Sequence, residues 1–147
     1  TYRRVLLPVD FSPRSVEALH RARAVAPQAE LVLLHAFEVP FEGKLRYAGV
    51  DESALSSLRI QAKREATAKM NELVVASGVD EARVRRLVLH GEASALILEQ
   101  ELEQDCDLIV IGKRGLGLLE ELLLGSVTKH VLAQSSADVL VIDRSQG

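Results

Sequence analysis

Five short runs of aliphatic residues stand out along the chain, and each run is continuous rather than alternating with polar positions. They are rich in Val, Leu and Ile and occupy residues 4–9, 30–37, 86–90, 107–112 and 138–143. Continuous apolar runs are typical of strands that are covered on both faces, as in a parallel sheet. The pattern therefore predicts five buried parallel strands.

The segments between these runs carry apolar residues at helical spacing. Ser12 and Pro13 are typical of an N-cap and a first helical position, so a helix is expected to begin there. A longer helix is predicted over residues 51–77, and Gly78 can end it in the left-handed conformation. The apolar stripe of this longer helix is Leu55, Leu58, Ala62, Ala66, Met70, Leu73 and Val74.

Two further helices are expected nearer the C-terminus. One is predicted by a short stripe, and the other opens at residues 125–126 and continues through Val127, Val131 and Leu132. The residues of the short stripe are Leu96, Ile97, Gln100 and Leu102. Residues 39–50 are irregular and are predicted to be a loop, of a length that is often functional or mobile.

Strands that alternate with helices in this way predict an α/β fold. The strands are expected to form an open five-stranded parallel sheet with right-handed crossovers, and the helices to cover both of its faces. A length of 147 residues fits a single domain that spans residues 1–147.

Composition narrows the classes of partner and compartment. The net charge is −3, so the chain lacks the basic surface that nucleic acid requires. The single Cys106 cannot form an internal disulfide, which fits a reducing compartment, and it is most simply a small buried residue. No apolar stretch approaches the roughly 20 residues of a membrane span, and the first residues lack the apolar core of a signal peptide. We therefore expect a cytoplasmic protein that binds neither nucleic acid nor a membrane.

Ligands of open parallel sheets sit beyond the carboxyl ends of the strands, and here the fourth run is followed by glycines. Gly112 and Gly115 would let the backbone approach a ligand with no β-carbon in the way. Gly125 and Ser126 open the last helix, whose free N–H groups and dipole favour an anion. These four residues either form a phosphate cradle or only shape a tight turn and a helix cap.

Polar residues follow other strands at the same edge of the sheet. Asp10 could accept hydrogen bonds from a ribose hydroxyl or an adenine amine, or it could be a cap or turn acid before the first helix. His35 and His90 are expected to be hydrogen-bonded structural residues. His20 and His130 lie in predicted helices and are expected on the surface, and the histidines have no metal-binding spacing.

Several enzyme classes lack their motifs in this sequence. The GxxxxGK[ST] phosphate loop is absent, and Gly112, Gly115 and Gly117 reverse the spacing of the dinucleotide-binding fingerprint. A receiver domain would want an aspartate after the third strand, where this chain has His90. No Ser-His-Asp, Cys-His or paired-carboxylate constellation is evident.

The stretch GKRGLGLLEELLLGS resembles the signature G-x2-G-x9-G-[ST] of the universal stress protein family. Gly112, Gly115, Gly125 and Ser126 occupy its four fixed places, and the resemblance extends through LLPVDFS, LVLLHAF and VTKHVL over essentially the whole chain. It implies a Rossmann-like fold with strand order 3-2-1-4-5 and a homodimer, often formed through the last strand. The complete signature is similar to the branch of the family that binds ATP, which implies an ATP-binding dimeric regulator of a stress response.

The resemblance also implies roles for individual residues. Around the adenosine it places Pro8, Val9, Asp10 and the backbone of Ala36. Along the ribose and the α-phosphate it places Ile111 and Gly112. The phosphates would be held by Gly115, Gly125, Ser126 and Val127, with Thr128 a marginal member. A Mg²⁺ ion would reach the site through phosphate oxygens, and at most weak ATP hydrolysis is expected.

Two alternatives stay open. The chain could be a dimeric scaffold that binds a partner protein and keeps only a vestigial pocket, with residues 122–124 as an apolar surface. Because some family members carry two such domains in tandem, the 147 residues could also be one half of a longer protein.

Overall fold

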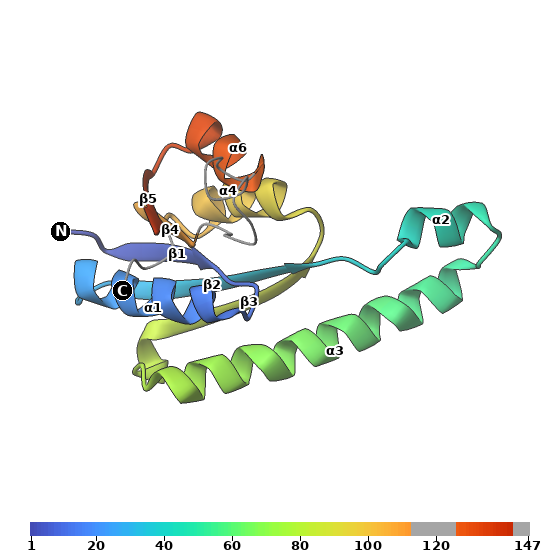
Figure 1. Ribbon diagram of the computed structural model, residues 1–147, viewed down its shortest axis with the longest axis horizontal. Helices are drawn as coiled ribbons and strands as arrows, with labels where there is room; N and C mark the ends of the chain where they lie inside the picture. The colour runs from blue at the N-terminus through green and yellow to red at the C-terminus, as the bar shows by residue number, and fades with distance from the viewer. Residues whose placement is uncertain (113–125, 143–147) are drawn as a thin grey trace.

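The computed structural model describes residues 1–112 and 126–142 and has the predicted alternation of strands and helices (Figure 1). In chain order the elements are β1 (Arg4–Pro8), α1 (Pro13–Val25), β2 (Glu30–Phe37), α2 (Glu42–Tyr47), α3 (Glu52–Ser77), the 3-10 turn η1 (Glu81–Arg83), β3 (Val84–His90), α4 (Ala93–Glu103), β4 (Leu108–Gly112), α6 (Ser126–Gln134) and β5 (Asp138–Ile142). All strand pairs are parallel, and the order is β3-β2-β1-β4-β5. The predicted α/β fold and strand order are thereby confirmed.

Each face of the sheet is covered by a pair of helices. Val5 and Leu7 belong to the apolar cluster that includes residues of α1 and α3, whereas Leu6 belongs to the cluster that includes residues of α4 and α6. Figure 1 shows the two helix pairs on opposite sides of the sheet. Because both faces are buried, successive strand positions must be apolar, which explains the continuous runs in the sequence.

The first helix begins at Pro13 as predicted, but the predicted side-chain cap at Ser12 is wrong. Ser12 is the N-cap residue by position, yet its Oγ is buried and has no hydrogen-bond partner among the described residues. The Ser12 backbone carbonyl accepts from the N–H of Ser15 at 3.0 Å instead. The Ser12 N–H is itself bound to the carboxylate of Asp10, which fixes the entry to the helix.

The segment predicted to be a loop between β2 and α3 contains the helix α2, so that prediction is wrong. Phe41 adopts the left-handed conformation with φ of 60°, and its carbonyl accepts the N–H of Leu45. Glu42 pairs with Arg59 of α3 and with His90 of β3. Because α2 buries none of its residues, these tertiary ion pairs rather than an apolar stripe hold it in place, and no hydrophobic periodicity marks it in the sequence.

The helix α2 and the first part of α3, residues 41–60, form an arm that extends beyond the carboxyl ends of the strands (Figure 1). Tyr47 is 96% and Phe41 71% exposed on it, and Leu58, which was predicted in the core stripe, is 44% exposed. The buried residues of α3 are Leu55, Ala66, Met70, Leu73 and Val74. Gly78 ends α3 with φ of 71°, as predicted.

The helix α4 buries a different residue from the predicted one near its C-terminal end. Ile97 and Gln100 are buried, but Leu102 is 71% exposed and Glu101 only 3%. Glu101 lies four residues after Ile97 and therefore on the same helix face. Its Oε1 accepts hydrogen bonds from the backbone N–H of Ser136 and of Ala137, which accounts for a buried carboxylate where a leucine was expected. None of the helices within the described ranges is both long and apolar enough to cross a bilayer.

Candidate functional site

The strand order brings the carboxyl ends of β1, β2 and β4 together at one edge of the sheet. β1 lies between β2 and β4, with Pro8 in register with Leu34 and Leu6 with Ile109. The helix after β1, α1, covers one face of the sheet, and the helix after β4, α6, covers the other. The carboxyl edge between β1 and β4 is therefore a topological switch point, and we refer to this place as the crevice. Asp10 follows β1 and Gly112 ends β4, as predicted, whereas Ala36 lies inside β2, one residue before its end.

A tight turn at Asp10 opens this crevice. The Asp10 Oδ1 accepts hydrogen bonds from the Ser12 N–H at 3.0 Å and from the Ser15 hydroxyl at 2.8 Å, and the Asp10 N–H donates to the Ser15 Oγ at 2.9 Å. Phe11 adopts a φ of 65° inside the turn, a strained conformation for a residue with a side chain. These hydrogen bonds are the ones expected of a turn acid before the first helix, which was one of the two alternatives for Asp10. Its carboxylate is exposed, and its role toward a ligand stays a prediction.

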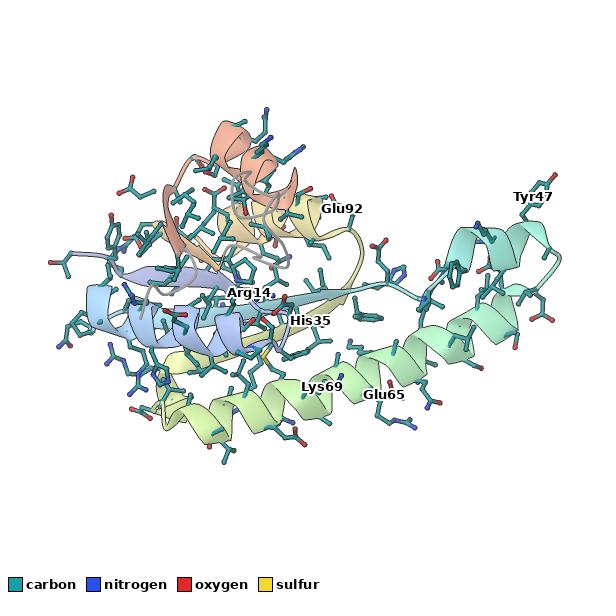
Figure 2. The ribbon with its side chains drawn as sticks, in the orientation of Figure 1. Arg14, His35, Tyr47, Glu65, Lys69 and Glu92 are labelled. Atoms are coloured by element: carbon teal, nitrogen blue, oxygen red, sulfur yellow. The ribbon has the colours of Figure 1, made fainter. Side chains whose placement is uncertain are left out.

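His35 is a structural residue of the same crevice, as expected. Its Nδ1 lies 2.7 Å from the Val9 carbonyl oxygen, which can only accept, so Nδ1 carries the proton and donates. The imidazole also packs on the Phe11 ring, with the ring centroids 4.4 Å apart. Val9 is in turn anchored by its N–H to the Leu34 carbonyl at 2.8 Å. Val9, Phe11 and His35 are therefore joined by direct contacts in the wall formed by β1 and β2, and Figure 2 shows His35 in this wall.

Gly112 ends β4 directly beside the first turn of α1. A β-carbon at this position would lie 3.4 Å from the Arg14 carbonyl oxygen and 3.7 Å from the Arg14 Cβ, which are ordinary contact distances. Its φ lies outside the left-handed region. Among the described residues, then, neither backbone conformation nor crowding demands glycine at position 112. The adjoining Ile111 and Val9 are buried, and Pro8 and Ala36 are half-buried.

Part of the predicted phosphate cradle falls outside the described residues. Gly115 and Gly125 lie there, as do Lys113, Arg114 and the apolar residues 122–124. Ser126 is the first residue of α6, which agrees with the predicted helix start. Val127 is half-buried against the cluster that contains Val131, and Thr128 is only 4% exposed.

The neighbouring helix α4 has an acid at its N-terminus. The Glu92 carboxylate accepts hydrogen bonds from the N–H groups of Ser94 and Ala95 at 2.7 and 3.1 Å. Hydrogen bonding, first of all from the Ser94 hydroxyl, lowers the pKa of Glu92 from its ordinary value. The N-terminus of α4 therefore already holds a negative charge, and a phosphate would be disfavoured there.

The remaining ionisable groups restrict the chemistry. Burial raises the pKa of the Cys106 thiol to about 11, so it is protonated at neutral pH and is not an activated nucleophile. No group of three His, Cys, Asp or Glu side chains within residues 1–112 and 126–142 is arranged to hold a metal ion. His20 and His130 are exposed and Cys106 is buried, as predicted.

A cavity of about 420 Å³ lies at the opposite, amino-terminal edge of the sheet. Two arginines line it, but both are engaged by backbone carbonyls. Arg23 donates to the Ser77 oxygen, and Arg83 donates to the oxygens of Pro27 and Ala29. This cavity is therefore a poorer candidate than the crevice at the carboxyl edge, because both of its arginines already bind backbone carbonyls.

Sequence reasoning missed two residues that shape the site. The Ser15 hydroxyl makes two hydrogen bonds to Asp10, one to its N–H and one to its carboxylate, and Arg14 borders Gly112. Both lie in the first turn of α1, three and two residues after the cap position. That position was a usable signal, since the first turn of a helix after β1 faces the carboxyl edge of the sheet.

Comparisons with known proteins agree with this fold. The sequence model described as "Universal stress protein family" matches residues 1–143. Universal stress protein MJ0577 of Methanocaldococcus jannaschii is 28% identical, over 97% of this chain and 96% of its own length. A universal stress protein of Thermus aquaticus is 32% identical, over 96% of this chain and 98% of its own length.

Solved structures give the same result. The structure of MJ0577 matches with a TM-score of 0.72 at 27% identity and covers 99% of both chains. A universal stress protein crystallised in complex with cAMP matches with a TM-score of 0.62 at 26% identity and covers 96% of both chains.

Proposed function

Because the chain belongs to the universal stress protein family, we propose that it binds an adenine nucleotide, with ATP as the expected ligand, and acts as a homodimeric regulator of a stress response. The observation that supports it is that β2, β1 and β4 are neighbours in the sheet, so that Asp10, Ala36 and Gly112 all lie near its carboxyl edge at the switch point. The cAMP complex of a relative supports an adenine nucleotide as the ligand class.

In this proposal the adenosine lies on the wall formed by β1 and β2. Pro8, Val9 and Asp10 flank it, and Ala36 offers its backbone to the adenine edge. The hydrogen bonds that Asp10 makes within its turn hold the carboxylate still, so that ordering it on binding costs little entropy.

The phosphates extend from β4 toward α6. Ile111 and Gly112 follow the ribose and the α-phosphate. No described residue crowds a β-carbon at position 112, which supports a role for this glycine in ligand approach. The remaining phosphate contacts are assigned to Gly115, Gly125, Ser126 and Val127. The N-terminus of α6 is the helix end we assign to the anion, since α4 already carries Glu92. Mg²⁺ would reach the site through phosphate oxygens, and the protein would work in the cytoplasm.

The test is calorimetric titration of the purified protein with Mg-ATP, with two matched glycine variants. Gly112→Ala puts a methyl group into the proposed path of the nucleotide, so we expect affinity to fall about tenfold or more. Gly43→Ala is the control, because a β-carbon at Gly43 meets no atom within 4 Å.

Three outcomes would separate the readings. Loss of affinity in Gly112→Ala alone supports the proposal. Equal affinity of both variants removes Gly112 from the site. No saturable heat with the unaltered protein, and no nucleotide released from it on denaturation, would leave the partner-binding scaffold as the better account.

A further inference from the structure

Arg14 stands out among the cations near the crevice. It is the second residue of α1, and its backbone oxygen and Cβ are the atoms closest to the position of a β-carbon on Gly112. Its side chain is half-buried and starts at the boundary between the first turn of α1 and the end of β4. Figure 2 shows Arg14 at this end of α1.

The other arginines of α1 have partners, whereas Arg14 has none within the described parts of the chain. Arg21 pairs with Glu17 at 3.8 Å, and Arg23 donates to the carbonyl of Ser77 at 3.0 Å. The nearest acid in sequence, Asp10, directs its Oδ1 to Ser12 and Ser15. Arg14 is a half-buried residue, and no carboxylate or carbonyl within residues 1–112 and 126–142 binds its guanidinium. Such an arrangement is unusual, because desolvating a charge without a partner is unfavourable.

The position of Arg14 indicates which ligand group would compensate the charge of its guanidinium. In the proposed binding mode Gly112 lies along the ribose and the α-phosphate, so a guanidinium that begins beside Gly112 is within reach of that phosphate. Guanidinium and phosphate form paired, charge-assisted hydrogen bonds, and partial burial strengthens them. The cation would also offset the repulsion between the phosphate and the Asp10 carboxylate at the same crevice.

We propose that Arg14 binds the phosphate next to the ribose and thereby makes this site selective for phosphorylated adenosine over adenosine itself. The inference rests on the proposed nucleotide-binding function and sharpens it. It identifies the α-phosphate, common to AMP, ADP and ATP, as the group that the Arg14 side chain binds. Arg14 is a specificity-determining residue in this account, and adenosine recognition stays with β1 and β2.

The experiment compares adenosine with AMP, without Mg²⁺, by calorimetric titration of four proteins. The unaltered protein should bind AMP about tenfold or more tightly than adenosine. Arg14→Gln should lower the affinity for AMP by about tenfold and change the affinity for adenosine by no more than about twofold. Arg14→Lys should keep part of the preference for AMP over adenosine. Arg21→Gln is the control on the same helix and should behave as the unaltered protein. Added KCl should narrow the preference in the unaltered protein more than in Arg14→Gln.

Each other result has one meaning. An unchanged preference for AMP in Arg14→Gln overturns the role of Arg14, and so does an equal loss for adenosine and AMP. Circular dichroism and thermal unfolding of each variant check that the fold is kept. If the unaltered protein binds neither adenosine, AMP nor Mg-ATP, the proposed function itself fails, and that result is distinct from a failure of Arg14 alone.

Discussion

Glu101 shows how much a single side chain contributes to the framework behind the site. Its buried carboxylate, on α4, satisfies the N–H groups of Ser136 and Ala137 in the turn between α6 and β5. Removing it takes the carboxylate acceptor away from the N–H groups of exposed Ser136 and half-buried Ala137. The carboxylate therefore ties α4 to the end of the helix that we assign to the phosphates.

We predict that Glu101→Ala lowers the free energy of unfolding by about 1–3 kcal/mol. Glu101→Gln keeps an acceptor oxygen and should recover part of that loss. Urea denaturation measures both, and Glu103→Ala, an exposed glutamate of the same helix, is the control with almost no expected effect. Equal losses in Glu101→Ala and Glu103→Ala would contradict the structural role.

At this scale the sequence predicted residues whose partners are close along the chain. The turn acid Asp10 binds Ser12 and Ser15, which are only two and five residues away, and a cap or turn pattern indicates such contacts. Glu101 was missed because its partners are 35 and 36 residues away and hydrophobic periodicity carries no information on them. Leu102 was assigned to the core for the same reason.

At the scale of elements, one carboxylate holds the arm to the sheet. Glu42 of α2 receives Arg59 Nη2 at 2.7 Å and Arg59 Nε at 3.2 Å, and His90 Nε2 of β3 lies 3.1 Å away. Arg46 is a weaker partner at 3.7 Å. The hydrogen bonds from Arg59, with a smaller effect of His90, lower the pKa of Glu42 from its ordinary 4.5 to about 2.

This shift predicts how the arm responds to acid. A carboxylate with a lowered pKa contributes stability that is complete above its unfolded-state pKa and is lost as the pH falls toward the folded value. Thermal unfolding between pH 6 and pH 2.5 should therefore show a steeper acid loss for the unaltered protein than for Glu42→Gln, which should be less stable at pH 6. Glu52→Gln is the control, because it removes an exposed acid that pairs with Arg46 within the described part of the chain. Parallel pH curves for the unaltered protein and Glu42→Gln would rule out the linkage.

The two helices of the arm show which kind of element the sequence can predict. The long helix α3 was predicted because its stripe is extended and Gly78 supplies a left-handed end. The short helix α2 was missed because it has no buried residue, and two other elements, α3 and β3, supply its ion pairs. Propensity and periodicity describe a helix that packs on a core, and α2 does not.

At the scale of the whole molecule, the alternation of strands and helices predicted a parallel α/β sheet but not the order of its strands. Five strands connected by helices also fit other doubly wound orders, and the order 3-2-1-4-5 came from the resemblance of GKRGLGLLEELLLGS to the family signature. The location of the candidate site followed from the parallel sheet alone, because carboxyl ends share one edge. Its phosphate side at Gly115 and Gly125 falls outside the described residues and stays a prediction.

The edge strand β5 carries the last prediction, the proposed homodimer. β5 pairs with β4 on one side, and its Val139, Leu140 and Val141 are only half-buried in the single chain. An apolar edge strand is a ready template for pairing with a second copy. Val141 belongs to neither of the two core clusters, so a change there should spare the fold.

We therefore expect the unaltered protein to sediment with twice the mass of the chain, and Val141→Lys to sediment as a monomer, because a charge at the strand edge disfavours pairing. Val25→Lys is the matched control, since Val25 is 48% exposed at the end of α1, away from β5, and this variant should remain dimeric. The monomeric variant should keep its affinity for Mg-ATP, because every residue assigned to the nucleotide comes from one chain. A dimer that persists in Val141→Lys would place the contact elsewhere, and the exposed apolar side chains of the arm would then be the surface to change next.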